Sequence, residues 1–405
     1  MENTKNMPSE QKRLTYTTNR TSFFDITEPN APIHKCEMKG FYIMIVLLVG
    51  YYILISCYIK FMSEGSFFEQ TFFENMVRDG KLVVLIWPCV FLYSWIAFFH
   101  QRLILAGLPH SGSWIIQHSS QSLMFLVTSY LVLTRDWGFT QTIFITFLCF
   151  THFMKMHSYT QINRDLREEW LKNPKDSAYP KNITFYDYLM YMVRPVLVYQ
   201  TSYPSIPKFR ISYFLKKCAL LSVQIITLYI CISDHILPII NERSPLFISW
   251  MKLAIPCLVT YWLVFFITFE QILNLFAELS LFGDREFYQD WWNSNTFADF
   301  SRKWNRPVHQ FLYKHVYLEA KERWGLTEKN AAYFTYFFSS LCHEMVVALV
   351  CKTIRPYLLG LMMFQIPLVL IAKVGGKEFG LYLFWTGIIT GPPLLCTLYS
   401  ISSFY

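Results

Sequence analysis

The sequence predicts an all-α membrane protein, a multi-pass bundle of about nine transmembrane helices. Of its 405 residues, 53% are hydrophobic and 19% are aromatic. Only 16% are charged, whereas roughly a quarter of the residues in a soluble domain carry a charge. Uncharged runs long enough to cross about 30 Å of hydrocarbon recur along the chain. These observations exclude an ordinary soluble enzyme.

Seven uncharged runs are each near or above the length of a membrane-spanning helix. They are 40–59, 82–101, 103–134, 137–154, 253–269, 356–372 and 379–405. Two further spans, 212–236 and 330–351, contain a few polar or charged residues. The polar first 39 residues contain no apolar core and do not form a cleavable signal peptide, so the first span is expected to direct insertion.

The distribution of Lys and Arg predicts the orientation. With nine spans and a cytoplasmic N-terminus, the cytoplasmic segments hold 24 Lys and Arg residues and the opposite loops hold 6. This asymmetry agrees with the positive-inside rule. It also explains the net charge of +8 without a nucleic-acid partner.

The sequence predicts a polar, partly disordered tail over 1–39 and one membrane-embedded domain over 40–405. Two large cytoplasmic loops are expected near 155–211 and 283–326. The first contains an aromatic stretch, 185–199, which reads as an interfacial strut or as the wall of a lipid-entry path. The second mixes Trp and Phe with charges of both signs. It predicts an interfacial element, either a Trp-rich anchor belt or a binding site, in which Arg302, Lys303 and Arg306 are free to meet phosphates.

The ten cysteines do not indicate a metal site. Nine of them fall in or at the ends of predicted spans, and no Cys-x-x-Cys spacing occurs. They are expected to serve as packing residues. No metal and no cofactor is expected.

Polar residues inside two spans need a compensating environment, because ionisable groups in lipid are costly. Glu270, Asn274 and Glu278 share one helical face, which is expected to turn inward as a structural network or, alternatively, to contact a substrate. His343 lies deeper in its span, with the hydroxyls of Ser339 and Ser340 on its face. Glu344 is rotated about 100° away and is expected to meet another partner. For His343, a structural role and a functional role both remain open on these grounds.

Three ordered motifs favour the functional role: FYQDWWN (287–293), WNRPVH (304–309) and SSLCHE (339–344). Together they resemble the membrane-bound O-acyltransferase superfamily, in the branch of sterol and diacylglycerol acyltransferases. The segments MKMHSY (154–159), PVLVYQTSYP (195–204), 273–293 and 298–317 are most similar to fungal-type sterol acyltransferases. The resemblance runs from about residue 40 to the C-terminus.

The resemblance implies helices that enclose a reaction chamber within the bilayer, and assembly as a dimer or larger homo-oligomer. It also implies the endoplasmic reticulum membrane as the location. The implied reaction passes an acyl group from acyl-CoA, a co-substrate, to the hydroxyl of a sterol drawn from the surrounding membrane lipids. The steryl ester is then a storage form.

By position in the motifs, His343 matches the catalytic histidine and Asn305 the motif asparagine. Trp304, His309 and Glu344 are expected to support them. The residues expected to handle acyl-CoA are Phe287, Tyr288, Asp290, Trp291, Trp292, Asn293, Phe300, Tyr317, Lys329 and Ser339.

The expected mechanism is direct transfer. A neutral His343 removes the proton of the sterol hydroxyl as it attacks the thioester, and Asn305 donates to the oxyanion or holds the thioester. One alternative is the same chemistry on diacylglycerol, which would make triacylglycerol. Another is a sterol-binding receptor or lipid transporter with no reaction.

Overall fold

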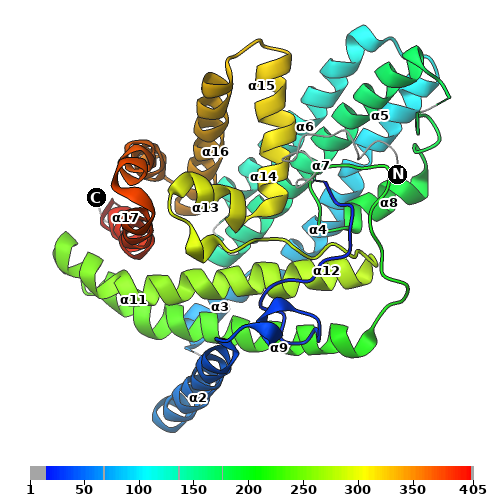
Figure 1. Ribbon diagram of the computed structural model, residues 1–405. Helices are drawn as coiled ribbons and strands as arrows, with labels where there is room; N and C mark the ends of the chain where they lie inside the picture. Colours follow the sequence, from blue (N-terminus) through cyan, green and yellow to red (C-terminus); the bar gives the residue numbers. More distant parts are fainter. Residues whose placement is uncertain (1–14, 67–68, 136, 176, 403–405) are drawn as a thin grey trace. The chain divides into compact units, whose positions relative to one another are not determined.

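The computed structural model describes residues 15–66, 69–135, 137–175 and 177–402 (Figure 1). The described residues form helices, turns and loops, with two isolated β-bridges and no longer strand. The chain divides into two compact units. Unit 1 comprises residues 1–72, 203–306 and 360–405, and unit 2 comprises residues 73–202 and 307–359. The predicted all-α class is confirmed for the described residues.

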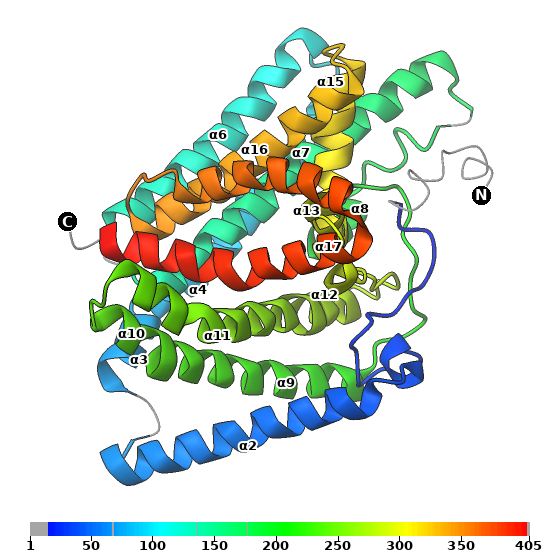
Figure 2. The same ribbon diagram turned by 60° about the vertical axis from the view of Figure 1, so that its left-hand side comes forward.

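Unit 1 contains three long helical rods built on α2, α9 and α11, nearly all of the long helix α17, and the segments that connect them. In its interior, α9 packs against α2, α11 and α12, as Figure 2 also shows. The short π-helical segments η3 and η4 continue α9 and α11 without a break. The elements are η2 (Pro32–Lys35), α2 (Lys39–Glu64), α9 (Ile211–Ile230), η3 (Cys231–Ile236), α10 (Leu237–Asn241), α11 (Leu246–Phe265), η4 (Phe266–Ile272), α12 (Leu273–Leu279), η5 (Trp291–Asn293), α13 (Phe297–Trp304) and nearly all of α17 (Tyr357–Ser402).

Helix α2 is uncharged from Gly40 to Ile59 and mostly apolar, yet none of its 26 residues is buried. An apolar surface of this size is stable only against another apolar medium, so α2 is a lipid-facing span. The helix ends at Gly65, whose φ of 68° is left-handed and whose N–H donates to the carbonyl of Phe61. This arrangement satisfies one of the last carbonyls of the helix.

Helix α17 consists of two arms that meet at Gly376, where φ is 85° and ψ is 176°. Figure 2 shows the second arm folding back along the first. The two spans predicted at 356–372 and 379–405 correspond to these arms. A residue with a side chain would be strained at this φ, so the turn requires glycine.

Unit 2 is a bundle around α7, which packs against α4, α5, α6 and α16. Four tyrosines form its centre, each at most 1% exposed: Tyr159, Tyr188, Tyr191 and Tyr199. The elements are α4 (Gly80–Ser94), α5 (Ile96–Leu105), α6 (His110–Thr134), α7 (Phe139–Lys172), α8 (Phe185–Val193), α14 (Arg306–Leu312), η6 (Tyr313–Tyr317), α15 (Leu318–Glu322) and α16 (Glu328–Cys351). Helix α3 (Gln70–Val77) connects the two units.

The predicted number of nine spans is not confirmed. Six helical stretches of the described chain are long and apolar enough to cross a membrane: 39–64, 70–105, 211–241, 246–279, 328–351 and 357–400. The last of these contains both arms of α17. Helix α6 is uncharged but rich in Ser, Gln and His, and only the first half of α7 is apolar, so neither meets the same standard.

About half of the predicted loop 155–211 proves to be helical, over 155–172 and 185–193. Helix α7 does not end with its apolar half but continues to Lys172, because polar residues of this second half are buried inside unit 2. The aromatic stretch forms α8, and two of its tyrosines belong to the tyrosine centre. The exposed Phe185 and Tyr186 leave only the beginning of α8 as a candidate for contact with headgroups.

Candidate functional site

His343 lies near the middle of α16 in unit 2. The helix begins where the hydroxyl of Thr327 accepts a hydrogen bond from the N–H of Asn330, and it ends at Lys352 with a left-handed φ of 50°. The ring Nδ1 of His343 is 2.7 Å from the carbonyl oxygen of Ser339. Since a carbonyl only accepts hydrogen bonds, Nδ1 carries the proton and Nε2 is the basic nitrogen of the neutral ring.

The side chain of His343 is exposed, so a reacting group could reach it. The expected orienting hydroxyls do not hold the ring. Ser340 is buried, and its hydroxyl donates to the carbonyl of Tyr336. Ser339 instead orients the ring through its backbone carbonyl. The geometry therefore supports His343 as a base whose orientation is set by its own helix.

Glu344 meets a different partner from His343, as its position on the helix predicts. Its carboxylate is buried and accepts a hydrogen bond of 2.8 Å from the backbone N–H of Leu359, in the first turn of α17. Unpaired N–H groups and the helix dipole both favour an anion at this place. Glu344 thus anchors the start of α17.

Other predicted site residues of unit 2 gather on elements that pack against α16. Segment η6 and helix α15 both contact α16. On α14 and η6, His309, Tyr313 and Tyr317 follow one another along one side: the rings of Tyr313 and Tyr317 stack at 5.4 Å, and His309 lies 6.5 Å from Tyr313. Lys329 is exposed in the first turn of α16, with its ammonium 5.9 Å from the ring of Tyr333.

A histidine pair lies in the interior of unit 2, with His315 buried and His157 half-buried. Nε2 of His315 and the hydroxyl of Ser158 are hydrogen-bonded at 2.7 Å, and the same hydroxyl accepts from the N–H of Tyr199 at 2.9 Å. The ring of His157 is 5.5 Å from that of His315. Burial lowers the pKa of His157 to about 4, with a further contribution from His118. Burial also lowers the pKa of His315, so both rings are neutral near pH 7.

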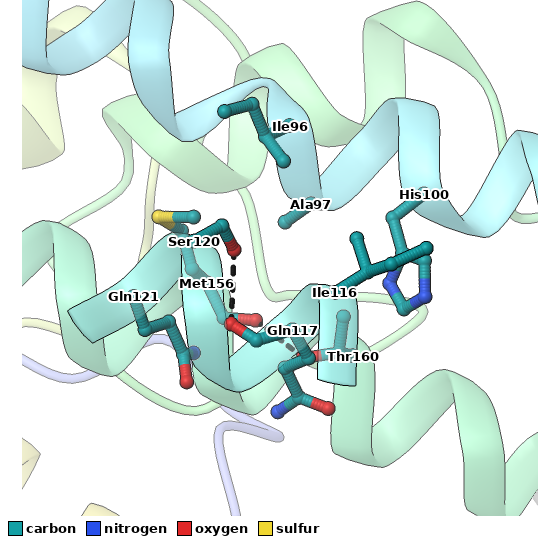
Figure 3. A pocket seen from close by; sticks show the side chains of 9 residues that line it. All are labelled: Ile96, Ala97, His100, Ile116, Gln117, Ser120, Gln121, Met156 and Thr160. Atoms are coloured by element: carbon teal, nitrogen blue, oxygen red, sulfur yellow. Dashed lines mark hydrogen bonds between the residues drawn. The ribbon is translucent and has the colours of Figure 1, made fainter. Parts of the chain in front are cut away.

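A small pocket in unit 2 with both apolar and polar side chains is lined by α5, α6 and α7 (Figure 3). The side chain of Gln121 is 1% exposed, and neither atom of its amide has a hydrogen-bond partner in the described part of the chain. The pocket volume of about 10 Å³ is enough for one water molecule, which could bind this amide, and is far too small for a lipid. It is therefore not the substrate site.

In unit 1, residues 283–290 form an irregular loop that leads into η5 and α13. Three of the residues expected to handle acyl-CoA are core residues of this unit: Phe287, Tyr288 and Trp291, each at most 3% exposed. The hydroxyl of Tyr288 donates to the carboxylate of Glu270. Their side chains support the loop, while Asp290 and Asn293 are exposed on it.

The remaining predicted residues of unit 1 surround this aromatic core. Trp304 stacks on Tyr261 at 4.6 Å and meets Trp291 edge-on at 4.8 Å. Phe300 contacts both tryptophans. The carbonyl of Trp292 accepts from the indole of Trp385 at 3.2 Å.

Asn305 is half-buried at the break between α13 and α14, with an extended backbone. The break is held by two backbone bonds to the loop, from Gln289 to Lys303 and from Arg306 to Phe287. Asn305 belongs to unit 1 and His343 to unit 2. Their joint role in the mechanism stays a prediction.

The expectation of a free basic cluster at 302–306 is wrong for two of its three members. Arg306 is 3% exposed and pairs with Asp284 and Glu286. Lys303 pairs with Asp290 and Asp299, which hold its pKa above the usual value against the effect of burial. Only Arg302 is exposed, beside Asp299. Carboxylates that the linear spacing did not reveal neutralise these cations.

The polar face of 270–278 turns inward, as predicted. Glu270, Asn274 and Glu278 are each at most 2% exposed. Glu270 lies 3.6 Å from Lys217, and Glu278 lies 3.0 Å from Arg210 and 2.5 Å from Arg285. These contacts establish the structural network.

Sequence reasoning missed the cations and anions that this network recruits from far along the chain. Asp25 and Glu28 come from the polar first segment and join the network through Lys217 and Arg210, and Arg285 comes from the loop. Charges of both signs in a tail that precedes the first span were a signal, but nothing in their spacing identifies the partners.

Comparison with known proteins shows which family this chain is similar to. A model of the membrane-bound O-acyltransferase family matches residues 109–401. A probable sterol O-acyltransferase 2 of Schizosaccharomyces pombe is 29% identical over 90% of this chain and 87% of its own length. A diacylglycerol O-acyltransferase 1B of Glycine max is 30% identical over 81% of this chain and 69% of its own length.

A sterol O-acyltransferase 2 of Candida albicans is 35% identical over 55% of this chain, and the match spans 39% of that relative. The family model covers well over half of the chain. The chain therefore belongs to the membrane-bound O-acyltransferase family.

Proposed function

We propose that this chain is a sterol O-acyltransferase of the endoplasmic reticulum membrane. It transfers the fatty acyl group of acyl-CoA to the 3-hydroxyl of a sterol and makes steryl esters for storage. The resemblance of several motifs to fungal-type sterol acyltransferases supports this proposal, as does the similarity to the S. pombe relative over most of both chains.

The observation that carries the chemistry is the bond from Nδ1 of His343 to the Ser339 carbonyl. It leaves Nε2 as the proton acceptor on an accessible side chain. A sterol hydroxyl is a weak nucleophile, and a positioned base typically accelerates such an attack by about 10² to 10⁴-fold.

The proposed reaction needs no covalent enzyme intermediate, because a thioester is already activated. Nε2 of His343 takes the hydroxyl proton while the sterol oxygen attacks the thioester carbon. The tetrahedral intermediate carries an oxyanion, to which the amide of Asn305 donates. The intermediate collapses with cleavage of the carbon–sulfur bond, and the coenzyme A thiolate receives the proton from the imidazolium. The products are a steryl ester and coenzyme A.

Acyl-CoA is proposed to keep its anionic head on the cytoplasmic side, where Lys329 is an exposed cation. The sterol is proposed to enter from the membrane lipids. A cytoplasmic N-terminus accords with the 24 to 6 asymmetry of Lys and Arg. A homo-oligomer, dimeric or larger, belongs to the same proposal.

A diacylglycerol O-acyltransferase is the second candidate. The G. max relative supports it, since its identity of 30% extends over 81% of this chain. The mechanism at His343 would be the same, with a different alcohol.

Product analysis tests the proposal. Membranes from cells that lack their own lipid acyltransferases would express the wild type, His343→Ala or, as a matched control, His118→Ala, which removes another exposed histidine of unit 2. Each receives labelled oleoyl-CoA with a sterol or with diacylglycerol. We expect labelled steryl ester from the wild type and the control, and at least about 100-fold less from His343→Ala at equal protein abundance.

Triacylglycerol as the main product, lost in His343→Ala, would show that the acceptor is diacylglycerol and would retain His343 as the base. Full activity of His343→Ala would remove His343 from the mechanism. Sterol binding with no product from either alcohol would favour a receptor or transporter.

A further inference from the structure

Residues 19–28, which we call the N-terminal strap, lie along the loop that contains the FYQDWWN motif. Both segments belong to unit 1. The N–H of Arg20 donates to the carbonyl of Gly283 at 3.0 Å, and the N–H of Arg285 donates to the carbonyl of Arg20 at 2.8 Å. The strap thus pairs with the loop as a minimal parallel β-bridge. The loop has no regular structure from 286 to 290, so its conformation depends on such neighbours.

The guanidinium of Arg20 makes three hydrogen bonds to this loop. Nε and Nη2 donate to the two carboxylate oxygens of Asp284 at 3.0 and 2.6 Å, and Nη1 donates to Glu286 at 2.7 Å. Asp284 is fully buried, and Arg306 is the second cation that meets both carboxylates. Bidentate pairs of this kind fix geometry as well as charge.

The strap also reaches the aromatic residues of the motif. The N–H of Phe24 donates to the hydroxyl of Tyr288 at 3.0 Å, and the ring of Phe24 lies 4.9 Å from that of Trp292. Phe23 contacts Trp292 at 5.1 Å. The hydroxyl of Ser22 donates to the carbonyl of Arg285 at 2.7 Å. The strap therefore supports the loop along its whole length, from Gly283 to Trp292.

The other end of the strap is anchored to the start of α9. Asp25 and Lys217, both about 2% exposed, form an ion pair at 2.8 Å. Burial alone would raise the pKa of Asp25, but Lys217 and hydrogen bonds from Thr27 and Tyr213 hold it below the usual value. Glu28 pairs with Arg210 at 2.6 Å. Because removing one partner of a buried pair leaves an uncompensated charge, this end resists detachment.

We propose that the N-terminal strap is a positioning element for the acyl-CoA side of the reaction, with Arg20 as the residue that holds the 283–293 loop in its working conformation. This inference rests on the proposed function. Arg20 acts through the loop and is not itself a catalytic residue. Asp290 and Asn293 are exposed, so the conformation of the loop decides how these two side chains meet acyl-CoA.

Kinetics with each substrate varied in turn test the proposal on the full chain. Arg20→Gln removes the charge and the bidentate geometry, while Lys35→Gln removes an exposed charge just beyond the strap. We expect Arg20→Gln to raise the KM for acyl-CoA about tenfold and to leave the KM for sterol within about twofold. Arg20→Lys should recover part of the loss, since it restores charge but not the two-point contact. Lys35→Gln should behave as the wild type.

Hydrogen exchange measured without substrate gives a readout independent of activity. In Arg20→Gln we expect faster exchange in 283–293 and none of this change in 173–184, a loop of unit 2. If Arg20→Gln does not accumulate, Ser22→Ala, which loses one bond to the same loop, should show the same changes at smaller size.

An unchanged KM for acyl-CoA together with unchanged exchange in 283–293 would overturn the proposal. So would an equal rise in both KM values, which indicates a general loss of folding. If the wild type forms no acyl product while the exchange still responds to Arg20→Gln, the proposed function fails and the structural coupling of strap and loop remains.

Discussion

At the scale of single residues, the environment of His157 and His315 in unit 2 makes the stability of the folded state sensitive to acid. His157 accepts from the amide of Gln117 at 3.4 Å, and its ring is close to those of His118 and His315. The nearby cations Arg164 and Lys314 add to the cost of a further positive charge. A proton on this pair would therefore be strongly unfavourable in the folded state.

The pH dependence of stability follows from this. Folded His157 has a pKa of about 4, and the unfolded residue has the ordinary value of 6.5. Between these values the unfolded chain binds more protons, so the free energy of unfolding falls as the pH is lowered. We expect a loss of about 2 kcal/mol from pH 7 to pH 5 due to His157, measured by thermal unfolding in detergent. His157→Gln should flatten this fall, whereas His235→Gln, which removes an exposed histidine, should not. Equal slopes for all three proteins would refute the assignment.

The contacts of a side chain could be predicted from the sequence only where the spacing of residues along a helix determines which groups lie on the same face. The inward face of Glu270, Asn274 and Glu278 follows from a repeat of four residues. The same reasoning proposed serine hydroxyls beside His343, but the rotamer of the ring selects the backbone carbonyl of Ser339 instead. The ion pairs of Arg306 depend on the irregular path of 284–290, which no periodicity describes.

At the scale of elements, α8 is held by a side chain of α7. The ammonium of Lys155 donates to the carbonyls of Tyr191, Met192 and Arg194 at 2.7 to 3.0 Å. These carbonyls are at the C-terminal end of α8, where unpaired acceptors and the negative end of the dipole favour a cation. Lys155 is thus a buried cap supplied by another helix.

Replacing this cap should destabilise the protein. We expect Lys155→Met to lower the free energy of unfolding by about 2 to 4 kcal/mol, because buried carbonyls lose their donor. Lys172→Met, which removes an exposed lysine of the same helix, should change it by less than about 0.5 kcal/mol. Denaturant unfolding in detergent measures both. Equal small effects would show that the three carbonyls find other donors at no cost.

The turn within α17 makes a second prediction at this scale. At Gly376 an added Cβ would meet no atom within 4 Å, but φ is 85°, so Gly376→Ala is strained only through its backbone. We expect a cost of about 1 to 2 kcal/mol in thermal unfolding. At Gly360 an added Cβ also has open space, and φ is ordinary for a helix. Gly360→Ala should be neutral or stabilise by up to about 1 kcal/mol. A neutral Gly376→Ala would mean that the two arms do not need this turn.

The ends of elements are where sequence reasoning was least reliable. The apolar run of α7 ends near Met154, and the polar residues that follow suggested a loop. They continue the helix because unit 2 buries several of them, including Lys155, Ser158 and Asn163. The first charged residues mark the end of the apolar surface of α7. The helix itself continues, because beyond that point it is surrounded by protein and no longer needs an apolar surface.

At the scale of the whole molecule, composition was sufficient for the fold class. A chain with 53% hydrophobic residues and an exposed 26-residue apolar helix belongs in a membrane. The number of spans was less certain, because α6 combines an absence of charges with many polar side chains, and only the first half of α7 is apolar. The three ordered motifs gave the resemblance to the family that the match over 109–401 confirms, and they lie partly in unit 1 and partly in unit 2.

The central claim is that the whole chain esterifies a sterol with His343 as the base. Competition with purified full-length protein in lipid nanodiscs tests it most directly. Equal amounts of sterol and diacylglycerol would compete for limiting labelled oleoyl-CoA, with wild type and His343→Ala compared at equal protein. The account predicts steryl ester as the dominant product and the loss of both products in the variant. Dominant triacylglycerol, or steryl ester formed at an undiminished rate by His343→Ala, would contradict it.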